Sequence, residues 1–428
     1  MQTHFSPRQL ADPALAEANS ILRACVHCGF CTATCPTYVL LGDELDSPRG
    51  RISLVKEMLE QDKPATAAVA THLDRCLSCF ACMSTCPSGV DYMHLIDTGR
   101  AHVERTYRRP WAERALRATV GAVLSHPGRL RIALALAWFA RPFAGLLPAR
   151  LRNMLKLAPK RPGVTATGPG TYPAAGPRRM RVALLTGCVQ SVMEDSINAA
   201  TVRLLTRHGV EVVVSKGASC CGALEHHLGR LDSARAAAVA SIRAWCAEID
   251  GKGLDAIVAN TSGCGTLVKD YGHLFRGDPA LVADATRVSE LVKDISEILA
   301  TLPLKFDAVQ ALRVVYHSAC SLQHGQRITA QPVKLLTDAG FDVRQPAESH
   351  LCCGSAGSYN ILQPEIAAAL RDRKAANLAA VQPEVICAGN VGCLVQIRSG
   401  AKVPVVHTVE LLDWATGGPA PEGLAAGR

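Results

Sequence analysis

The feature that most constrains how this chain can fold is the stretch CVHCGFCTATCP, residues 25–36, which places four cysteines within twelve positions. A second stretch, CLSCFACMSTCP at residues 76–87, repeats the same spacing, C-x2-C-x2-C-x3-C-P. Closely spaced thiols form disulfides in an oxidising compartment and bind metal in a reducing one. The first two dozen residues lack the basic start, apolar stretch and small-residue cleavage site of a secretory signal. We therefore expect a cytoplasmic protein whose clustered cysteines bind metal.

The spacing of both stretches is that of bacterial ferredoxins, in which three cysteines of a run bind one 4Fe-4S cluster and the fourth binds the neighbouring cluster. It predicts two clusters with crossed ligands. The first would be bound by Cys25, Cys28, Cys31 and Cys86, and the second by Cys35, Cys76, Cys79 and Cys82. The alternative is zinc, which also accepts thiolates, although structural zinc sites usually show two short cysteine pairs separated by a longer loop.

The sequence between the two runs, DSPRGRISLVKEMLE, predicts a helix that covers the clusters. Ser47 can cap this helix, Pro48 suits its first position, and apolar residues follow at helical spacing. Arg49 and Arg51 lie in its first turn, where their charges could stabilise a reduced cluster. The alternative is that both arginines are solvated.

Composition limits the classes of function that remain. With 428 residues, of which 48% are hydrophobic and 19% charged, the chain is an ordinary globular protein of several domains. A net charge of +9 and 4% aromatic residues, without a Lys/Arg block, give no nucleic-acid groove.

The longest wholly apolar run, Ile132–Ala140, is too short for the ~20 residues that span a bilayer. Basic residues gather around it, between Arg100 and Arg161. Such a segment suits peripheral contact with an anionic membrane or with a partner. The alternative is a helical pair packed on its own protein, with solvated arginines.

The character of the sequence changes after the segment Pro159–Arg179, which contains five prolines and four glycines and predicts a connecting segment. Beyond it, short β-branched runs alternate with helical patterns, which predicts βαβ units with mainly parallel strands. The expected strands are Val182–Leu185, Glu211–Val214, Ala256–Ala259, Val314–His317, Phe341–Val343 and Val385–Ala388.

The second half of the chain also repeats itself. Cys188 and Cys320 are 132 positions apart, and so are the Cys-Cys-Gly triplets that begin at Cys220 and Cys352. This predicts a duplicated α/β module with four cysteines at the ends of its strands, where open α/β sheets bind their ligands. These candidate ligands are Cys188, Cys220, Cys221 and Cys264 in the first module and Cys320, Cys352, Cys353 and Cys393 in the second.

Plainer explanations exist for several of these residues. A Cys-Cys pair can be two small buried apolar side chains or a labile vicinal disulfide. Cys246 and Cys387 fall outside the repeated pattern and are predicted to be core residues. His226, His227 and His317 lie near the cysteine turns and could donate hydrogen bonds to sulfur, or be ordinary structural histidines.

These patterns predict an α+β multidomain fold: an all-α ferredoxin-like domain with two clusters, followed by a duplicated α/β module. The expected boundaries are 1–110 for the two-cluster domain and 111–180 for a basic helical segment and linker. The first Cys-Cys-Gly module would occupy 181–302 and the second 303–428.

Paired C-x2-C-x2-C-x3-C-P runs, an intervening PRGR helix and two modules ending in Cys-Cys-Gly together resemble the iron-sulfur subunits of glycolate oxidase, from about Ile21 to the end of the chain. The wider group includes the corresponding subunits of anaerobic glycerol-3-phosphate dehydrogenase, of lactate-utilisation systems and of heterodisulfide reductase. The resemblance implies a complex in which FAD-dependent subunits oxidise glycolate to glyoxylate. This chain would then pass the electrons toward a quinone or another carrier, with peripheral contact at the inner face of the membrane.

The chain departs from heterodisulfide reductase at one motif. There the Cys-Cys-Gly pattern closes with C-x-x-C, whereas here Leu267 follows Cys264 and Gln396 follows Cys393 at that distance. Four ligands per module remain, enough for a further conventional cluster or for none. A catalytic role on a disulfide is correspondingly less credible, although it stays open as the alternative function.

The sequence has no G-x-G-x-x-G fingerprint and no Walker A loop, so we expect no flavin or nicotinamide on this chain. Hydride-equivalent chemistry on a 2-hydroxy acid requires a cofactor such as flavin, which would lie on the partner. No residue of this chain is expected to be catalytic, and the chain is expected to be an enzyme only as a subunit of an oxidoreductase complex.

Overall fold

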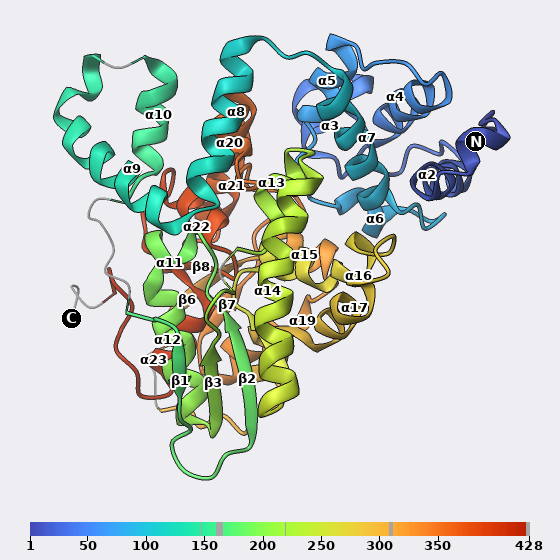
Figure 1. Cartoon of the computed structure of the whole chain (residues 1–428). Coiled ribbons are helices and arrows are strands. Elements are labelled where there is room, and N and C mark those ends of the chain that lie inside the picture. Colours follow the sequence, from blue (N-terminus) through green and yellow to red (C-terminus); the bar gives the residue numbers. More distant parts are fainter. Residues whose placement is uncertain (147, 160–165, 219, 308–310, 425–428) are drawn as a thin grey trace.

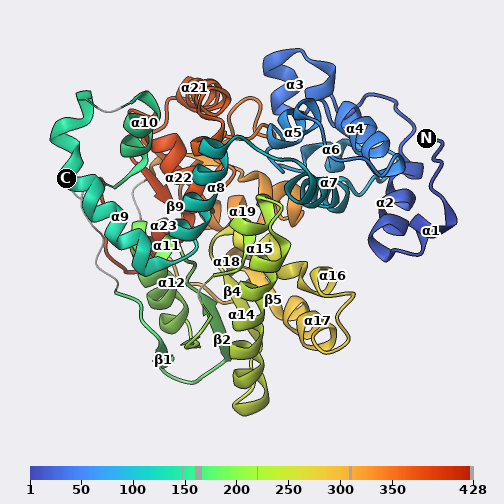
Figure 2. The ribbon, with the colours of Figure 1, turned by 45° about the horizontal axis from the view of Figure 1, so that its top comes forward.

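The computed structural model describes residues 1–146, 148–159, 166–218, 220–307 and 311–424 (Figure 1). A helical domain is formed by the first quarter of the chain, and two α/β modules are formed by the chain from β1 (Gly170–Tyr172) onward. Between them, helices α8 to α10 extend to the side of the molecule opposite the N-terminus, as Figures 1 and 2 both show. The predicted α+β class is confirmed.

Proline and polar caps set the helix starts of the N-terminal domain. Pro7, Pro13, Pro36 and Pro48 each occupy the first helical position, where a missing N–H costs nothing. Ser47 caps α4 by accepting a hydrogen bond from Gly50 N, as the sequence predicts. The helices are α1 (Pro7–Leu10), α2 (Pro13–Ala24), α3 (Pro36–Leu41), α4 (Pro48–Glu60), α5 (Ala67–Asp74), α6 (Ala81–Thr85) and α7 (Tyr92–Thr106).

The middle segment contains α8 (Trp111–Leu124), α9 (Pro127–Ala140), the short η2 (Arg141–Leu146) and α10 (Ala149–Leu157). Its link to the first module is the predicted connecting segment Pro159–Arg179, of which residues 160–165 lie outside the described residues. The remainder of that segment contains a strand, β1 (Gly170–Tyr172), so it does more than connect. No helix in the described part of the chain combines the length and the apolar character needed to cross a bilayer.

The first module is a five-stranded sheet in the order β1-β3-β2-β4-β5, parallel except for β1. Its other strands are β2 (Met180–Leu185), β3 (Val210–Val214), β4 (Ala256–Ala259) and β5 (Val292–Asp294). Its helices are α11 (Gln190–Met193), α12 (Asp195–Arg207), α13 (Ala223–His227), α14 (Leu231–Gly251), α15 (Ser262–Lys269), α16 (Tyr271–Leu274), α17 (Val282–Leu291) and α18 (Ile295–Leu299).

The second module is an all-parallel sheet in the order β7-β6-β8-β9. Its strands are β6 (Arg313–His317), β7 (Asp342–Arg344), β8 (Val385–Ala388) and β9 (Val405–His407). They are accompanied by η3 (Ser321–Gly325), α19 (Ala330–Asp338), α20 (Tyr359–Leu362), α21 (Pro364–Ala380), α22 (Val391–Arg398) and α23 (Thr408–Ala415). Its strand order matches β3-β2-β4-β5 of the first module, so the predicted duplication is confirmed.

All six predicted strands are present, within two residues of their expected bounds. The sequence missed β1, β5 and β9, each of which has only three residues. A three-residue strand lacks the length over which alternation can be recognised.

The two modules share one hydrophobic core. On β2, Val182 and Leu184 point into this shared core, whereas Ala183 and Leu185 point to the opposite face, against α14 and α15. Helix α12 of the first module packs on α23 of the second. This packing fixes the modules against each other and therefore determines where their strand ends meet.

Candidate metal centres

The first candidate site is a pocket lined by Cys25, Cys28, Cys31 and Cys86, the ligands predicted for the first cluster, together with Cys82. Cys25 ends α2 and Cys86 ends α6, so the crossing cysteine comes from the second run. Cys28 is exposed, which places this pocket near the surface. Burial raises the pKa of the Cys31 thiol to about 11.

The second candidate site is a pocket lined by Cys35, Cys76, Cys79 and Cys82, the set predicted for the second cluster. All four cysteines are buried. Both pockets suit an iron-sulfur cluster because each offers at least four thiols and none of the described residues that line them is a carboxylate. The structure thus brings together the cysteines that the crossing rule groups; the cluster assignment itself stays a prediction.

Left-handed backbone curls each run around its pocket. In the first run, His27 and Gly29 flank Cys28 and have φ values of 56° and 86°. In the second, Ser78 and Phe80 flank Cys79 with φ values of 48° and 59°. Four residues in this sparsely populated region, three of them with side chains, are costly for a loop. The shared strain is typical of a loop whose shape is set by its ligand.

Arg51 lies against the second pocket. Its guanidinium is buried, its Nη1 donates toward Cys35 Sγ at 3.8 Å, and its Nε donates to His72 O at 2.7 Å. Burial raises the pKa of Cys76, but the charges of Arg51 and Arg100 outweigh it and hold that pKa below its ordinary value. Arg49, in contrast, is partly exposed and pairs with Glu44 at 2.6 Å. Of the two arginines considered from the sequence, Arg51 is the one that contacts a cysteine of the second pocket.

A fully buried carboxylate, Asp46, holds Arg51 in place. It accepts hydrogen bonds from Arg51 Nη2 at 3.2 Å and Arg75 Nη1 at 2.8 Å, and its Oδ1 lies 3.0 Å from His72 Nδ1. The sequence analysis missed Asp46, although its position one residue before the helix-capping Ser47 is a signal that could have drawn attention to it. Two further missed residues contact the second pocket: Tyr92, whose hydroxyl donates toward Cys76 Sγ at 3.7 Å, and Arg100, which donates to Cys76 O.

The eight cysteines of the two modules meet in a single cavity of about 220 Å³. Strands β2, β4, β6 and β8 all end at this cavity, because the modules face each other with the carboxyl ends of their sheets. The cysteines are Cys188, Cys220, Cys221, Cys264, Cys320, Cys352, Cys353 and Cys393. Sequence reasoning expected four at each module, and the offset of 132 gave no indication that the two sets share one space.

The sulfur atoms within the cavity contact one another. Cys320 Sγ lies 3.8 Å from Cys352 Sγ. A hydrogen bond from Cys188 lowers the pKa of the Cys220 thiol.

The glycine of each Cys-Cys-Gly triplet is required by its backbone. Gly222 and Gly354 have φ values of +86° and +87°. A Cβ at either position would lie 2.6 Å from a carbonyl oxygen, that of Ala234 or Ala367. The triplet therefore turns tightly against a long helix, α14 in the first module and α21 in the second, which fixes the paired cysteines at the cavity wall.

The N-terminal domain packs directly onto this cavity. Leu77 and Ser78, which lie between two cysteines of the second pocket, also line the eight-cysteine cavity. Cys79 shares a buried apolar cluster with Cys352 and Tyr359 of the second module. The Tyr359 hydroxyl donates to Arg75 O at 3.0 Å. The second pocket and the cavity are thus neighbours across a buried, largely apolar interface.

The two other cysteines and the three histidines considered from the sequence lie in different surroundings. Cys246 on α14 and Cys387 on β8 are buried in the hydrophobic cores, as predicted. His227 lines the cavity, and burial lowers its pKa to about 3. The Nδ1 atom of His226 lies 3.8 Å from Oδ2 of Asp97. His317 lies beside Cys353 and Cys393.

Two models of known protein families match this chain. The model of the 4Fe-4S dicluster domain matches residues 21–90. The model of the cysteine-rich domain matches twice, over residues 182–269 and 314–398. Together with the two four-thiol pockets, these matches point to iron-sulfur clusters.

Similar proteins cover between 55% and 97% of the chain. The glycolate oxidase iron-sulfur subunit of Escherichia coli (strain K12) is 41% identical over 97% of this chain and 99% of its own length. The probable glycolate oxidase iron-sulfur subunit of Bacillus subtilis (strain 168) is 32% identical over 92% of this chain and 94% of its own length. Lactate utilization protein A of Bacillus licheniformis is 26% identical over 55% of this chain and 99% of its own length.

Proposed function

Because the chain belongs to the family of glycolate oxidase iron-sulfur subunits, we propose that it carries electrons from a flavoprotein that oxidises glycolate to glyoxylate toward a quinone or another acceptor. Cys25, Cys28, Cys31 and Cys86 would hold one 4Fe-4S cluster. Cys35, Cys76, Cys79 and Cys82 would hold the other. When bound, such clusters supply transfer of single electrons.

The single observation that carries this proposal is that three thiol-lined spaces lie one beside the next in the structure. The first pocket reaches the surface at Cys28, and Cys82 lines both it and the second pocket. The second pocket in turn packs on the eight-cysteine cavity through Cys79 and Cys352. Such a series, running inward from the exposed end, is the arrangement that a relay of electrons requires.

The side chains around the second pocket favour a more negative, reduced state there. Arg51 and Arg100 bring two buried positive charges to the cysteines, and Tyr92 donates a hydrogen bond to sulfur. Positive charge and hydrogen bonds to sulfur raise a cluster's reduction potential. The buried position of the second pocket also excludes water from the path. We propose that electrons move from the exposed pocket inward.

Oxidation of the hydroxy acid would take place on the partner, since the sequence contains no G-x-G-x-x-G fingerprint for a flavin or nicotinamide cofactor. The test is to isolate the chain from its host, identify the flavoprotein that accompanies it, and assay the complex on glycolate, lactate and glycerol 3-phosphate. We expect a flavoprotein and a preference for glycolate. A complex that prefers lactate would instead assign the chain to electron transfer in lactate oxidation, the function that its similarity to lactate utilization protein A favours. Isolation without any flavoprotein would contradict the proposal.

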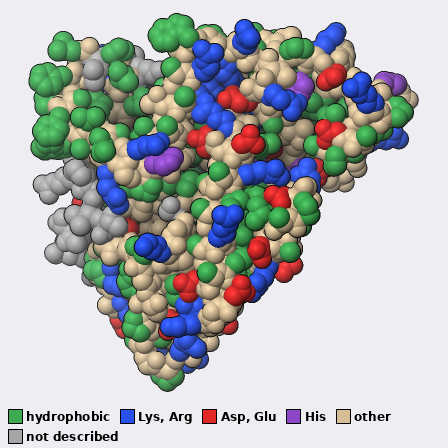
Figure 3. All heavy atoms as spheres, viewed as in Figure 1, with side chains coloured by type: hydrophobic (Ala, Val, Ile, Leu, Met, Phe, Trp, Pro, Cys, Tyr) green, Lys and Arg blue, Asp and Glu red, His purple; other side chains and the backbone are tan. Residues whose placement is uncertain are grey.

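We further propose that α9 and η2 dock on an anionic membrane surface, where a quinone acceptor would be found. Six large apolar side chains there are exposed, and Figure 3 shows hydrophobic side chains gathered over α9 and α10. They are Ile132, Leu136, Trp138, Phe139, Phe143 and Leu146, the last with 85% of its surface exposed. No Asp or Glu occurs in the sequence between Glu113 and Glu194, so the surrounding charge is positive. Apolar side chains ringed by cations are typical of helices that lie in a lipid headgroup layer.

Sedimentation with phosphatidylglycerol vesicles tests this docking. The double variant Phe139→Ser, Phe143→Ser should bind these vesicles at least about tenfold more weakly, because it removes two large exposed apolar side chains that would insert into the membrane. Trp111→Ser is the matched control, since it removes a 77% exposed aromatic side chain from the start of α8. Equal binding by the double variant and the wild type would contradict the docking, and equal binding to neutral vesicles would contradict the role of charge.

The eight-cysteine cavity supports a second candidate function, reduction of a disulfide or quinone by this chain itself. Its volume of about 220 Å³ and its lining of thiols from both modules favour a small acceptor. The isolated chain, supplied with electrons from reduced methyl viologen, should then turn over such an acceptor without the flavoprotein. Absence of turnover would leave electron transfer within the complex as the function.

A further inference from the structure

The ring of His317 has no ordinary structural explanation. It stands at the end of β6, 1% exposed, and neither its Nδ1 nor its Nε2 has a hydrogen-bond partner among the described residues. A buried imidazole almost always satisfies at least one of its nitrogens. Two unsatisfied nitrogens on one buried ring therefore indicate a missing ligand.

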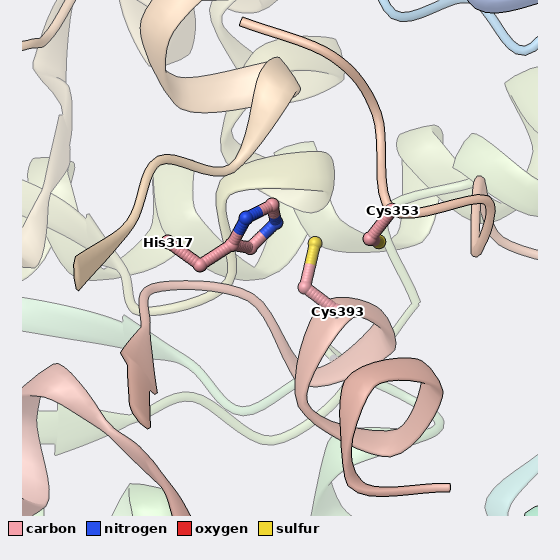
Figure 4. A group of neighbouring side chains, drawn as sticks. All are labelled: His317, Cys353 and Cys393. Atoms are coloured by element: carbon pink, nitrogen blue, oxygen red, sulfur yellow. The ribbon is translucent and has the colours of Figure 1, made fainter. Parts of the chain in front are cut away.

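Two thiols lie beside this ring. A ring nitrogen of His317 and the Sγ atoms of Cys353 and Cys393 all lie within 4.8 Å of one another, and all three residues are buried. Figure 4 shows the imidazole and the Cys393 thiol pointing toward one another, with Cys353 beyond. For tetrahedral zinc with Zn–S bonds of about 2.3 Å, the ligand atoms lie roughly 3.5 to 3.8 Å apart. The three groups could reach that geometry through small side-chain movements.

The first module lacks this arrangement. The position equivalent to His317 is Leu185: Leu185 pairs with Ala259 at the end of β2, and His317 pairs with Ala388 at the end of β6. The thiols of Cys221 and Cys264 correspond to those of Cys353 and Cys393, but the leucine offers no ligand atom. The duplicated modules thus differ at the one position that would complete a mixed nitrogen and sulfur site.

We propose that His317, Cys353 and Cys393 bind a single divalent transition metal ion of the zinc type, separate from the two ferredoxin-type clusters. Binding would form one Zn–N and two Zn–S bonds and release the two thiol protons to solvent. Two thiolates and a neutral imidazole then cancel the charge of the ion, so the neighbouring ammonium of Lys374 does not repel the site. Both cysteines line the cavity, which leaves the fourth coordination position facing it.

A 4Fe-4S cluster at the second module is the competing arrangement. It would take all four cysteines, Cys320 and Cys352 included, and would leave His317 without a bond to metal. The nitrogen ligand distinguishes the two arrangements, because only the mononuclear site uses it. This distinction does not depend on which substrate the complex oxidises or on whether electrons pass through the chain.

The test is metal analysis and zinc-edge X-ray absorption on the full chain, purified anaerobically and supplied with Zn²⁺ alone. We expect about one zinc per chain, with a first shell of two sulfurs and at least one imidazole nitrogen. His317→Leu, which installs the residue found at the equivalent position of the first module, and Cys393→Ser should each weaken zinc retention at least about tenfold. Iron in the N-terminal domain should be unchanged in both variants, which also reports that they fold.

Cys264→Ser is the matched control, since it removes the equivalent thiol of the first module. It should retain zinc with an unaltered absorption spectrum. Absence of zinc from the wild-type chain would overturn the proposal, as would full zinc retention by His317→Leu. Equal loss in Cys264→Ser would place the metal elsewhere in the cavity and overturn it as well.

Discussion

The guanidinium of Arg51 lies 3.8 Å from Cys35 Sγ, and both side chains are buried. The same guanidinium is paired with Asp46, whose carboxylate is fully buried and also contacts His72 and Arg75. A positive charge is thereby fixed beside a cysteine that crosses from the first run to the second pocket. This relationship links the helix between the two cysteine runs to the electronic properties of the site.

Replacement of Arg51 should change both potential and stability. Arg51→Gln should lower the reduction potential of the cluster bound at Cys35, because it removes a charge that favours the reduced form. It should also destabilise the fold by about 3 to 5 kcal/mol, because Asp46 loses a partner inside the protein. Potentiometric titration followed by EPR measures the first effect, and denaturant unfolding measures the second.

Two further variants serve as controls for Arg51→Gln. Arg51→Lys keeps the charge and should restore most of the potential. Arg49→Gln removes an arginine from the same turn that is partly exposed and bound to Glu44, so it should leave the second cluster unchanged. A potential that is the same in Arg51→Gln and in the wild type would show that this charge does not act on the cluster.

A second prediction concerns the cluster that depends on Cys86, the cysteine that crosses from the second run to the first pocket. Cys86→Ser should impair the cluster built mainly from the first run, because Cys86 lines the pocket of Cys25, Cys28 and Cys31. EPR spectra of the reduced protein should lose that cluster and retain the one whose potential Arg51→Gln shifts. Selective loss of the second cluster would disprove the crossed assignment.

A third prediction concerns stability and the tight turn at Gly354. Gly354→Ala combines a strained φ of +87° with a Cβ only 2.6 Å from Ala367 O. Gly340 has a similar φ of +90°, but nothing lies within 4 Å of its Cβ position. Gly340→Ala should therefore cost about 1 to 2 kcal/mol for backbone strain alone, and Gly354→Ala about 1 to 3 kcal/mol more for the clash. Equal unfolding free energies of the two variants would contradict the close approach.

A fourth prediction concerns pH. Burial lowers the pKa of His94, but hydrogen bonds with Asp270 and Asp91 outweigh it and raise that pKa to about 10. His94 lies on α7, whereas Asp270 belongs to the first module, so the ion pair joins the two domains. The neighbouring His273 stacks on His94 with ring centroids 3.5 Å apart, and both burial and the charge of His94 lower its pKa. The pKa values of the two stacked rings therefore shift in opposite directions.

Because the folded pKa of His94 is above its unfolded value of about 6.5, the stabilisation is fully present below pH 6.5 and lost as pH rises through 10. His94→Gln should lower the unfolding free energy at pH 6.5 and have progressively less effect toward pH 10. Urea unfolding of both proteins across this range is the measurement. A difference between them that does not change with pH would contradict the assignment.

The fold could be predicted from the sequence to the extent that local patterns determine it. The spacing of the cysteine runs, the cap at Ser47 and the offset of 132 between the Cys-Cys-Gly triplets indicated the helical domain and the duplicated module. The three-residue strands β1, β5 and β9 could not be predicted, because so few residues carry no periodicity. Pairing with neighbouring strands, not their own sequence, holds them in place.

The candidate sites, too, could be predicted only in part from the sequence. Grouping of Cys86 with the first run could be anticipated from the spacing, whereas the meeting of all eight module cysteines could not, because sequence offsets do not specify how two modules face each other. Asp46 was missed because a buried carboxylate is recognised by its partners, which come from two separate helices: Arg51 lies on α4, and His72 and Arg75 lie at the end of α5. His317 could have been singled out by comparing the repeats, since Leu185 occupies the equivalent position.

We propose above all that the N-terminal domain holds two 4Fe-4S clusters that relay electrons. The most direct measurement is iron and sulfide analysis of anaerobically purified protein, with low-temperature EPR after reduction by dithionite. The two-cluster assignment predicts brown protein with about eight iron and eight sulfide per chain in the N-terminal domain and the signals of two interacting reduced clusters. Colourless protein that stays EPR-silent after reduction would contradict it.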